Sequence, residues 1–214
     1  SNQLLNTSGI SADALRRVMP IFDEMRVELM AGQFLDIHEQ TQKNTDLARS
    51  VKIARYKSGK YTIERPLHLG AVLAGDAAPS LLAALSEYGL PLGEAFQFRD
   101  DLLGVFGDPS VTGKPAGDDL REGKRTALIA ITDAKCTDAM KAESRKYFGK
   151  NDIDEKGVAI LQEMIISTGA KAQLETMIDD LTSKALSAIE NPAINNAGRD
   201  LLNELALIAT KRSM

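Results

Sequence analysis

The sequence predicts an all-helical protein. Alanine and leucine are abundant, tryptophan is absent, and in most segments apolar residues recur at spacings of three and four rather than two. A chain of 214 residues with 43% hydrophobic and 26% charged residues is long enough for one sizeable core. We therefore expect residues 1–214 to form a single helical domain.

The first long helix is expected to follow Ser11. Its helical pattern includes "PIFDEMRVELMAGQFLDIHEQ", residues 20–40. Pro20 either opens the main helix or kinks it, and Gly32 could let another backbone approach.

The next segment has a proline inside its pattern. Helical spacing runs from about residue 46 to 57, meets "KSGKY", and resumes over residues 62–75 with Pro66 inside. We interpret this junction as a broken helix.

The rest of the chain alternates helices with one long loop. Residues 79 to about 106 predict a long helix bent at residues 89–91, and residues 107–125 a glycine-rich, charged loop. Asp152 or Asp154 would cap a later helix. The later helices are expected near residues 126–134, 137–147, 154–167, 170–190 and 192–210.

Composition excludes several functions. The net charge of −4 and the pI near 5.3 argue against a nucleic-acid partner. Cys136 is the only cysteine, so an intrachain disulfide and a zinc cluster of thiolates are excluded, and the reducing cytoplasm fits best. The sequence contains no apolar run long enough to span a bilayer and does not open with a signal peptide, so neither membrane insertion nor secretion is indicated. His38 and His68 lack the spacing of metal ligands.

The stretch "FQFRDDLLGVFGD" places acids among apolar residues. On a helix Asp100, Asp101 and Asp108 share one narrow sector with Gln97 and Gly104. Buried carboxylates require a cation or hydrogen-bond donors, and Mg²⁺ is bound by one or two carboxylates together with substrate phosphates. The stripe is therefore a candidate Mg²⁺ site. A solvent-facing stripe on an amphipathic helix is the alternative.

The loop "GDPSVTGKPAGDDLREGKR" carries Lys114 and Lys124 among glycines. Its backbone could fold closely around an anion, and cations next to clustered acids suggest a metal bridged to a phosphate. Because the loop matches no Walker A pattern, a solvated surface turn is the alternative.

Two other polar groups are weaker candidates. "YKSGKY" puts Lys57, Ser58 and Tyr61 at the predicted helix break, where side chains can be aimed at a ligand. An ordinary helix end with basic residues near its negative dipole is the alternative. Gln33 and Asp36 in "GQFLD" share a helix face, which is also common where no site exists.

Read in order, "GQFLD", "KSGKY", "FQFRDDLLGVFGD" and "GKPAGDDLREGKRT" resemble the polyprenyl synthetase family, the trans-isoprenyl diphosphate synthases, most of all its bacterial geranylgeranyl diphosphate synthases. The resemblance implies an antiparallel helical bundle of the isoprenoid synthase type around a deep cavity, with an aspartate-rich motif on each of two facing helices. Asp100 and Asp101 match the second motif. A homodimer is implied as well.

The resemblance also implies a reaction. An allylic diphosphate ionises with the help of Mg²⁺ and cationic side chains, and the double bond of isopentenyl diphosphate attacks the carbocation before a proton is lost. The product is a longer trans-polyprenyl diphosphate, geranylgeranyl or similar. The implied roles are Asp100 as metal ligand with Asp101 as an auxiliary contact, Lys57 and Lys114 on the allylic diphosphate, Lys57, Ser58 and the Gln97 carbonyl near the cationic carbon, Gln33, Asp36 and Tyr61 around the pocket, and Lys124 as the second lysine of the loop.

Three residues depart from the family pattern. Gly104 stands where many members carry a third aspartate, Ser58 replaces the commoner threonine but keeps the hydroxyl, and Pro91 interrupts a helix that is usually unbroken. Neither of the last two changes is disabling.

The family's first motifs are not found in this sequence. These are "DDxxD", "GGKxxRP" and "RRGxP". We therefore expect the chain to be the later part of a polyprenyl synthetase domain, incomplete on its N-terminal side and inactive alone. Its expected partner is a second copy or the missing N-terminal part as a separate fragment. A noncatalytic subunit of a heteromeric synthase and a class I terpene cyclase are alternatives, and the lysine loop argues against the cyclase.

Overall fold

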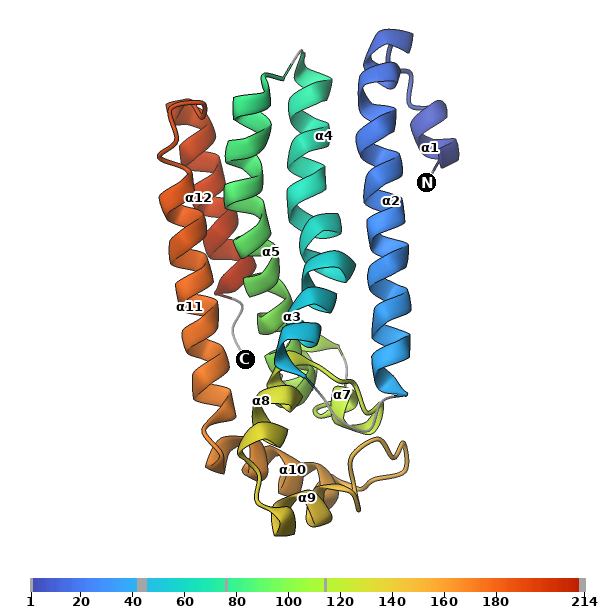
Figure 1. The fold of residues 1–214 in the computed structure, drawn as a ribbon, viewed down its shortest axis with the longest axis vertical. Helices are drawn as coiled ribbons and strands as arrows, with labels where there is room; N and C mark the ends of the chain where they lie inside the picture. Colours follow the sequence, from blue (N-terminus) through green and yellow to red (C-terminus); the bar gives the residue numbers. More distant parts are fainter. Residues whose placement is uncertain (1, 42–45, 76, 114, 212–214) are drawn as a thin grey trace.

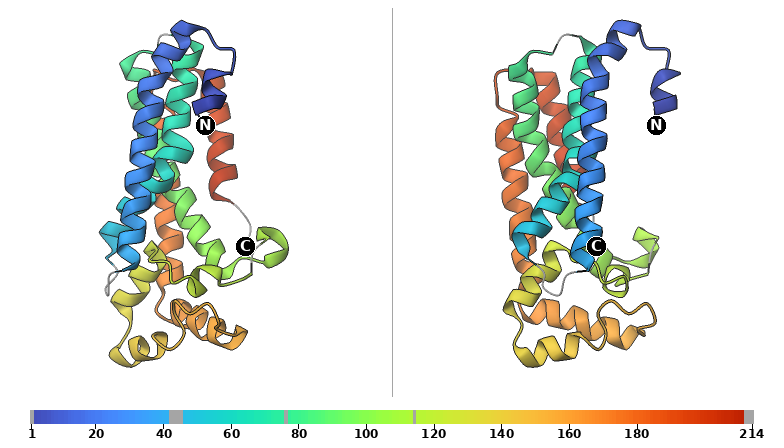
Figure 2. Two further views of the ribbon diagram at one scale, coloured as in Figure 1. Left: turned by 90° about the vertical axis from the view of Figure 1, so that its right-hand side faces the viewer. Right: turned by 45° about the vertical axis from the view of Figure 1, so that its right-hand side comes forward.

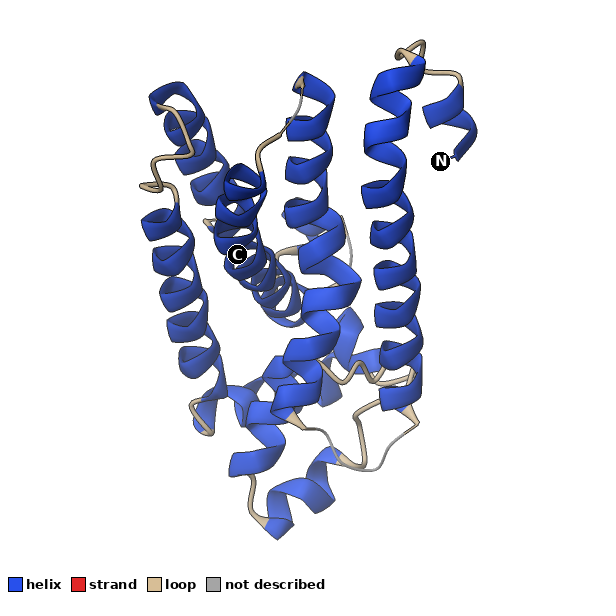
Figure 3. Cartoon of the chain, turned by 45° about the horizontal axis from the view of Figure 1, so that its top comes forward, coloured by secondary structure: helices blue, strands red, loops and turns tan. Residues whose placement is uncertain are grey.

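The structure is a computed structural model that describes residues 2–41, 46–75, 77–113 and 115–211. Within these ranges every regular element is a helix, which confirms the all-α prediction (Figure 3). The long helices run alongside one another, the helices between residues 109 and 167 gather at one end of the bundle, and the short helix of residues 2–6 lies toward the other end (Figures 1 and 2).

The elements follow the predicted order closely. They are α1 Asn2–Asn6, α2 Ala12–Gln40, α3 Leu47–Ala54, η1 Arg55–Glu64, α4 Arg65–Ala74, α5 Pro79–Phe106, α6 Pro109–Thr112, α7 Asp118–Arg121, α8 Ala127–Lys135, α9 Asp138–Ser144, α10 Glu155–Ser167, α11 Ala170–Ala188 and α12 Asn196–Thr210. Side-chain caps explain several starts, since Ser11, Thr126 and Asp154 each accept a hydrogen bond from the backbone three residues on.

Three predicted boundaries were wrong. The last helix begins at Asn196 rather than at residue 192, because Asn195 is its cap and accepts from the Gly198 backbone N–H at 2.8 Å. The helix expected over residues 137–147 ends at Ser144. The predicted loop at residues 107–125 contains the short helices α6 and α7.

The predicted helix break at "KSGKY" is also wrong. From α3 to α4 the chain stays helical, and η1 is a π-helix, wound more widely than an α-helix. The backbone N–H of Arg65 accordingly bonds to the carbonyl of Lys60, five residues back. Pro66 follows directly, and its ring would clash with the carbonyl four residues earlier in an α-helix. Widening the helix ahead of this proline keeps it continuous.

Helix α5 lies in the middle of the bundle. Tyr88, Leu92, Phe98 and Leu102 are fully buried, each worth about 1.5–3 kcal/mol of hydrophobic stabilisation for a side chain of this size. The Tyr88 hydroxyl donates to the backbone carbonyl of Leu202 on α12 at 2.6 Å. α5 also packs against α11 and η1. Its C-terminal end, which carries the acidic stripe, is therefore held in place.

Helix α2 has an apolar stripe on each side. Val18, Phe22 and Met25 face the core. The opposite face exposes four large apolar side chains, each more than half exposed: Val27, Met30, Phe34 and Ile37. An exposed stripe of this kind is typical of a surface that another polypeptide covers. In the described ranges we find no helix with the length and apolar character needed to cross a bilayer.

Candidate functional site

A chain of hydrogen bonds links η1 to α5 at the buried end of the site. Gln97 and Asp101 are one turn apart on α5, and Gln97 Nε2 donates to Asp101 Oδ1 at 2.8 Å. Gln97 Oε1 accepts a hydrogen bond from the Ser58 hydroxyl on η1. Because the Gln97 amide NH₂ donates to the Asp101 carboxylate, the Gln97 amide oxygen is on the side that faces Ser58. Three residues singled out by the sequence are thus brought together.

Asp101 is buried, with only 5% of its surface exposed. Burial raises the pKa of its carboxyl to about 7, and the Asp119 and Asp100 carboxylates also raise this pKa. The hydrogen bond from Gln97 and the Lys57 ammonium act in the opposite direction. The carboxyl is therefore poised near neutral pH, and a cation brought next to it would favour its charged form.

Lys57 projects from η1 toward α2. Its Nζ lies 2.6 Å from Asp36 Oδ2, and one third of the Lys57 side chain is exposed. An ammonium has three donors, and Asp36 engages one of them at this distance. The Lys57 charge is also close enough to Asp101 to lower the pKa of that carboxyl. Lys57 therefore stands between the α2 carboxylate and the acidic end of α5, where it could contact an anionic ligand.

Asp119 is a site residue that sequence reasoning did not identify. It lies on α7 and is largely buried, and Lys124 makes an ion pair with it. Burial raises the pKa of Asp119, the hydrogen bond from Lys124 lowers it, and the nearby Asp100 raises it. A Cβ placed on Gly104 would lie 2.5 Å from Asp119 Cγ. Asp119 therefore occupies the space beside Gly104, where an aspartate of the family pattern would begin.

The sequence contained a signal for this arrangement. Gly104 leaves a gap in the acidic stripe, and "GKPAGDDLREGK" supplies an acidic pair just ahead of Lys124. Gly104 has no side chain, so the Asp119 carboxylate from the loop can fill the space beside it. Only the structure, which places the loop against α5, shows that these two residues meet.

The other predicted site residues are exposed or lie outside the described residues. Asp100 is exposed, beside Asp101 and Asp119, since its charge shifts the pKa of both. Gln33 and Tyr61 are exposed. Lys114 lies outside the described residues.

Asp108 is not part of the site. Helix α5 ends at Phe106, and the Asp108 carboxylate caps α6 by accepting from the Ser110 backbone N–H at 2.8 Å. Hydrogen bonds from the Ser110 hydroxyl and backbone lower the pKa of Asp108. The predicted acidic stripe therefore holds two carboxylates on α5, and Asp119 adds a third from the loop.

The carboxylates fit a hard divalent cation. In the described ranges, no three histidine, cysteine or acidic side chains come together as a ready-made metal cage. Mg²⁺ does not require one, because it keeps several waters and is held by one or two carboxylates and substrate phosphates. The raised pKa values of Asp101 and Asp119 show that negative charge is costly here, so a cation would stabilise it.

The chain is similar in sequence to proteins of one known family. The sequence model of the family described as polyprenyl synthetase matches residues 2–165. Geranylfarnesyl diphosphate synthase of Aeropyrum pernix is 32% identical over 198 residues, covering 92% of this chain and 60% of that protein. Geranylgeranyl diphosphate synthase of Saccharolobus solfataricus is 26% identical over 208 residues, covering 95% and 61%.

Solved structures show the same likeness. Geranylgeranyl pyrophosphate synthase of Corynebacterium glutamicum, complexed with isoprenyl diphosphate and magnesium, superimposes with a TM-score of 0.93 at 41% identity over 99% of this chain and 60% of that one. Polyprenyl synthase of Caulobacter crescentus, complexed with calcium and isoprenyl diphosphate, gives 0.82 at 29% identity, covering 92% and 59%. The chain thus spans about 60% of the length of these relatives. By sequence and by fold, it belongs to the polyprenyl synthetase family.

Proposed function

We propose that this chain carries the diphosphate-binding end of a trans-prenyltransferase that condenses isopentenyl diphosphate with an allylic diphosphate. The bond between C1 and the diphosphate oxygen of the allylic substrate breaks, and diphosphate leaves with the electron pair. The double bond of isopentenyl diphosphate then forms a new carbon–carbon bond to C1, and a proton is lost. The product is a trans-polyprenyl diphosphate that is one isoprene unit longer, geranylgeranyl diphosphate or similar.

One observation carries this proposal: in a member of this family, Ser58, Gln97 and Asp101 form a connected chain beside Lys57. The Lys57 ammonium would stabilise the negative charge that develops on the departing diphosphate. The Ser58 hydroxyl and the Gln97 carbonyl present oxygen dipoles to an electron-deficient carbon. Asp36 holds Lys57 in place through its 2.6 Å contact.

The carboxylates supply the other half of the site. We propose that Asp100 and Asp101 hold Mg²⁺, with Asp119 beside them and Lys124 balancing the charge of Asp119. When bound, the metal neutralises the leaving diphosphate and so lowers the barrier to ionisation. Lys114, Gln33 and Tyr61 are proposed to line the diphosphate and the pocket around it.

The exposed apolar face of α2 is the basis for the assembly that we propose. Its exposed stripe, defined by Val27, Met30, Phe34 and Ile37, would be costly to leave in water, and we propose that a second copy of the chain covers it in a homodimer. The N-terminal part of a synthase as a separate fragment is the other partner proposed. Residues 1–214 are then the later part of the synthase domain, working in the cytoplasm.

The test is a radiolabel assay on the complete polypeptide that the gene encodes. Labelled isopentenyl diphosphate is incubated with dimethylallyl, geranyl or farnesyl diphosphate, with Mg²⁺ or with a chelator, and the products are separated by chain length. We expect Mg²⁺-dependent chain extension. Lys57→Ala should lower kcat by roughly 10²- to 10³-fold, the usual effect of removing one group that stabilises developing charge.

Lys184→Ala is the matched control, because Lys184 is an exposed lysine on α11, next to Ala185, which packs in the same core cluster as Tyr88. It should leave the rate within twofold of the unsubstituted protein. Consumption of the allylic diphosphate without incorporation of label would indicate a cyclase instead. Full activity of Lys57→Ala would refute the assigned role of the ammonium.

A further inference from the structure

The π segment η1 is in backbone contact with a helix on each side. On the α2 side, a Cβ placed on Gly32 would lie 2.7 Å from the Lys57 Cα and from the Tyr56 carbonyl carbon. On the α5 side, a Cβ on Gly93 would lie 2.7 Å from the Gly59 carbonyl oxygen and 2.8 Å from its carbon. Real Cβ atoms do not approach other atoms within 3.0 Å. Both neighbours are backbone, so no side chain can swing aside.

These two contacts bracket the residues that matter for chemistry. Gly32 meets the backbone at Tyr56 and Lys57, and Gly93 meets it at Gly59. Lys57 is therefore at one of the two points where the backbone of η1 is fixed, and Ser58 lies between them. The positions of the Lys57 ammonium and the Ser58 hydroxyl depend on how closely η1 packs against α2 and α5.

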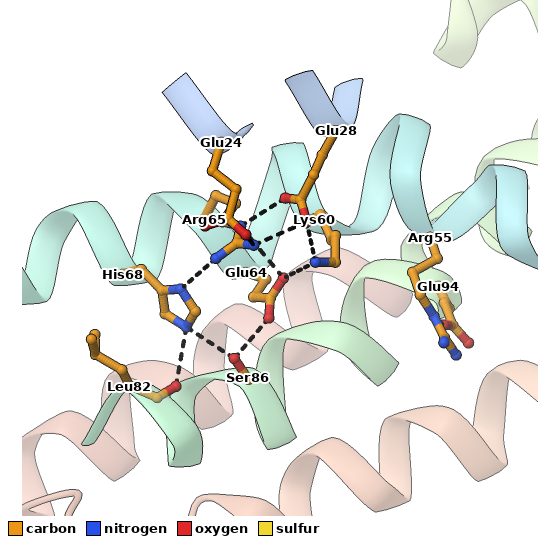
Figure 4. Close-up of polar contacts among 10 residues, drawn as sticks. All are labelled: Glu24, Glu28, Arg55, Lys60, Glu64, Arg65, His68, Leu82, Ser86 and Glu94. Atoms are coloured by element: carbon orange, nitrogen blue, oxygen red, sulfur yellow. Dashed lines mark hydrogen bonds and ion pairs between the residues drawn. The ribbon is translucent and has the colours of Figure 1, made fainter. Parts of the chain in front are cut away.

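Ion pairs hold η1 against both neighbours (Figure 4). Arg55, its first residue, pairs with Glu94 on α5. Lys60, in the middle of η1, pairs with Glu28 on α2. These charges favour close seating, and the absence of side chains at the two glycines permits it.

We propose that Gly32 and Gly93 are positioning residues, which set the reach of Lys57 and Ser58 by letting η1 sit in direct backbone contact with α2 and α5. This inference rests on the prenyl-transfer function proposed above. In Gly32→Ala, restoring an ordinary contact of 3.4 Å from 2.7 Å requires a shift of at least about 0.7 Å at the Lys57 Cα, and the backbone N of Lys57 is closer still. Displacements of about 1 Å in a catalytic site can lower rates by roughly 10²-fold.

The chain supplies two matched glycine controls. A Cβ on Gly70, which is in α4, meets nothing within 4 Å, so Gly70→Ala makes the same chemical change in open space. A Cβ on Gly89 would lie 2.9 Å from the Glu64 Cα, a milder backbone clash at the end of η1 remote from Lys57. Gly89→Ala therefore reports the loss of stability without a displacement at the site.

The experiment measures kcat, KM and thermal unfolding for the four alanine variants of the complete gene product, well below the unfolding transition. For Gly32→Ala and Gly93→Ala we expect kcat to fall roughly 10- to 100-fold and KM to change much less. Gly70→Ala should match the unsubstituted protein. Gly89→Ala should unfold at a lower temperature yet keep kcat within about threefold.

A crystal structure of Gly32→Ala makes the test independent of the reaction. It should show the Lys57 backbone displaced away from α2 by at least about 0.7 Å and a lengthened contact from Lys57 Nζ to Asp36. An undisplaced backbone would overturn the positioning role, and so would a loss of kcat in Gly89→Ala equal to that in Gly32→Ala. Inactivity of the unsubstituted protein would instead refute the proposed function and leave the structural test to decide this inference.

Discussion

Replacing Glu28 by glutamine should destabilise the protein more than any ordinary surface change. Glu28 accepts hydrogen bonds from Arg65 Nε at 2.8 Å and from a second Arg65 nitrogen at 2.9 Å, and it also pairs with Lys60. All three side chains are nearly buried, with exposed fractions of 10–14%. The carboxylate thus joins two cations that lie on η1 and at the start of α4 (Figure 4).

The expected loss in the free energy of unfolding depends on the acidic neighbours that Lys60 and Arg65 keep in Glu28→Gln. Removing one member of a buried ion pair usually costs about 3–5 kcal/mol, because the partner is left charged in a poor solvent. Here Glu64 stays within 3.7 Å of Lys60, and Glu24 stays 2.8 Å from Arg65, so neither cation loses every acidic neighbour. We therefore expect about 3 kcal/mol, the low end of the range. For a chain of this length that is roughly 6–12 °C in Tm.

The assay is urea unfolding followed by circular dichroism at several pH values. Burial opposes the charged form of Glu28, but hydrogen bonds from Arg65 and Lys60 outweigh it and lower the pKa. A lowered carboxyl pKa contributes stability above its unfolded value of 4.5, and this is lost as the pH falls through the folded value. The difference between Glu28→Gln and the unsubstituted protein should therefore be full at pH 7 and shrink in acid.

Glu24→Gln is the matched control. Glu24 also pairs with Arg65, but its side chain is 56% exposed. An exposed pair contributes about 0–1 kcal/mol, so this variant should unfold almost as the unsubstituted protein does. The reasoning is refuted if Glu28→Gln costs less than 1 kcal/mol at pH 7, or if its cost does not shrink when the pH is lowered well below 4.5.

Two further predictions concern the acidic end of α5. Because burial raises the pKa of Asp101 from 3.8 to about 7, its contribution to stability without divalent metal is present below pH 4 and lost as the pH rises through 7. Asp101→Asn should therefore be the more stable protein at pH 8 in a chelator, by up to about 4 kcal/mol, and should lose this advantage at pH 4; equal denaturation midpoints at pH 8 would contradict the burial argument. Gly104→Ala should leave the free energy of unfolding within about 1 kcal/mol, because only the end of the Asp119 side chain must move. The Mg²⁺ concentration for half-maximal activity should rise roughly tenfold, and an unchanged Mg²⁺ titration would exclude a role for Asp119 beside the metal.

The sequence predicted the helices well where the cause is local. Apolar spacing and caps such as Thr126 and Asp154 depend only on neighbouring residues, and the structure places these helix starts at the expected positions. Helical spacing placed Gln97 and Asp101 on one face of their helix, whereas only the family resemblance placed Ser58 and Gln97 near the same carbon. The hydrogen bonds that connect the three residues were not predicted.

The sequence misled where the cause is tertiary. "KSGKY" has the composition of a helix end, yet the chain stays helical because its backbone is supported by α2 and α5. The Glu28, Lys60 and Arg65 cluster was not predicted, because its members lie 32 and 37 residues apart along the chain. Residues this far apart show no periodic signal in the sequence. Glu28 on a charged helix face gives the same sequence pattern whether or not Lys60 and Arg65 pack against it.

Asp100 and Asp101 show why exposure alone does not rank neighbouring carboxylates. They are consecutive on α5 and lie on the same side of the helix, yet Asp100 is exposed and Asp101 is buried. The exposed Asp100 can meet a hydrated cation without first being desolvated. The buried Asp101 has already lost its water and is held by Gln97, so a cation there gains a fixed and poorly hydrated partner. Exposure of Asp100 therefore agrees with a metal role, because Asp100 stays beside Asp101 and Asp119 rather than remote from them.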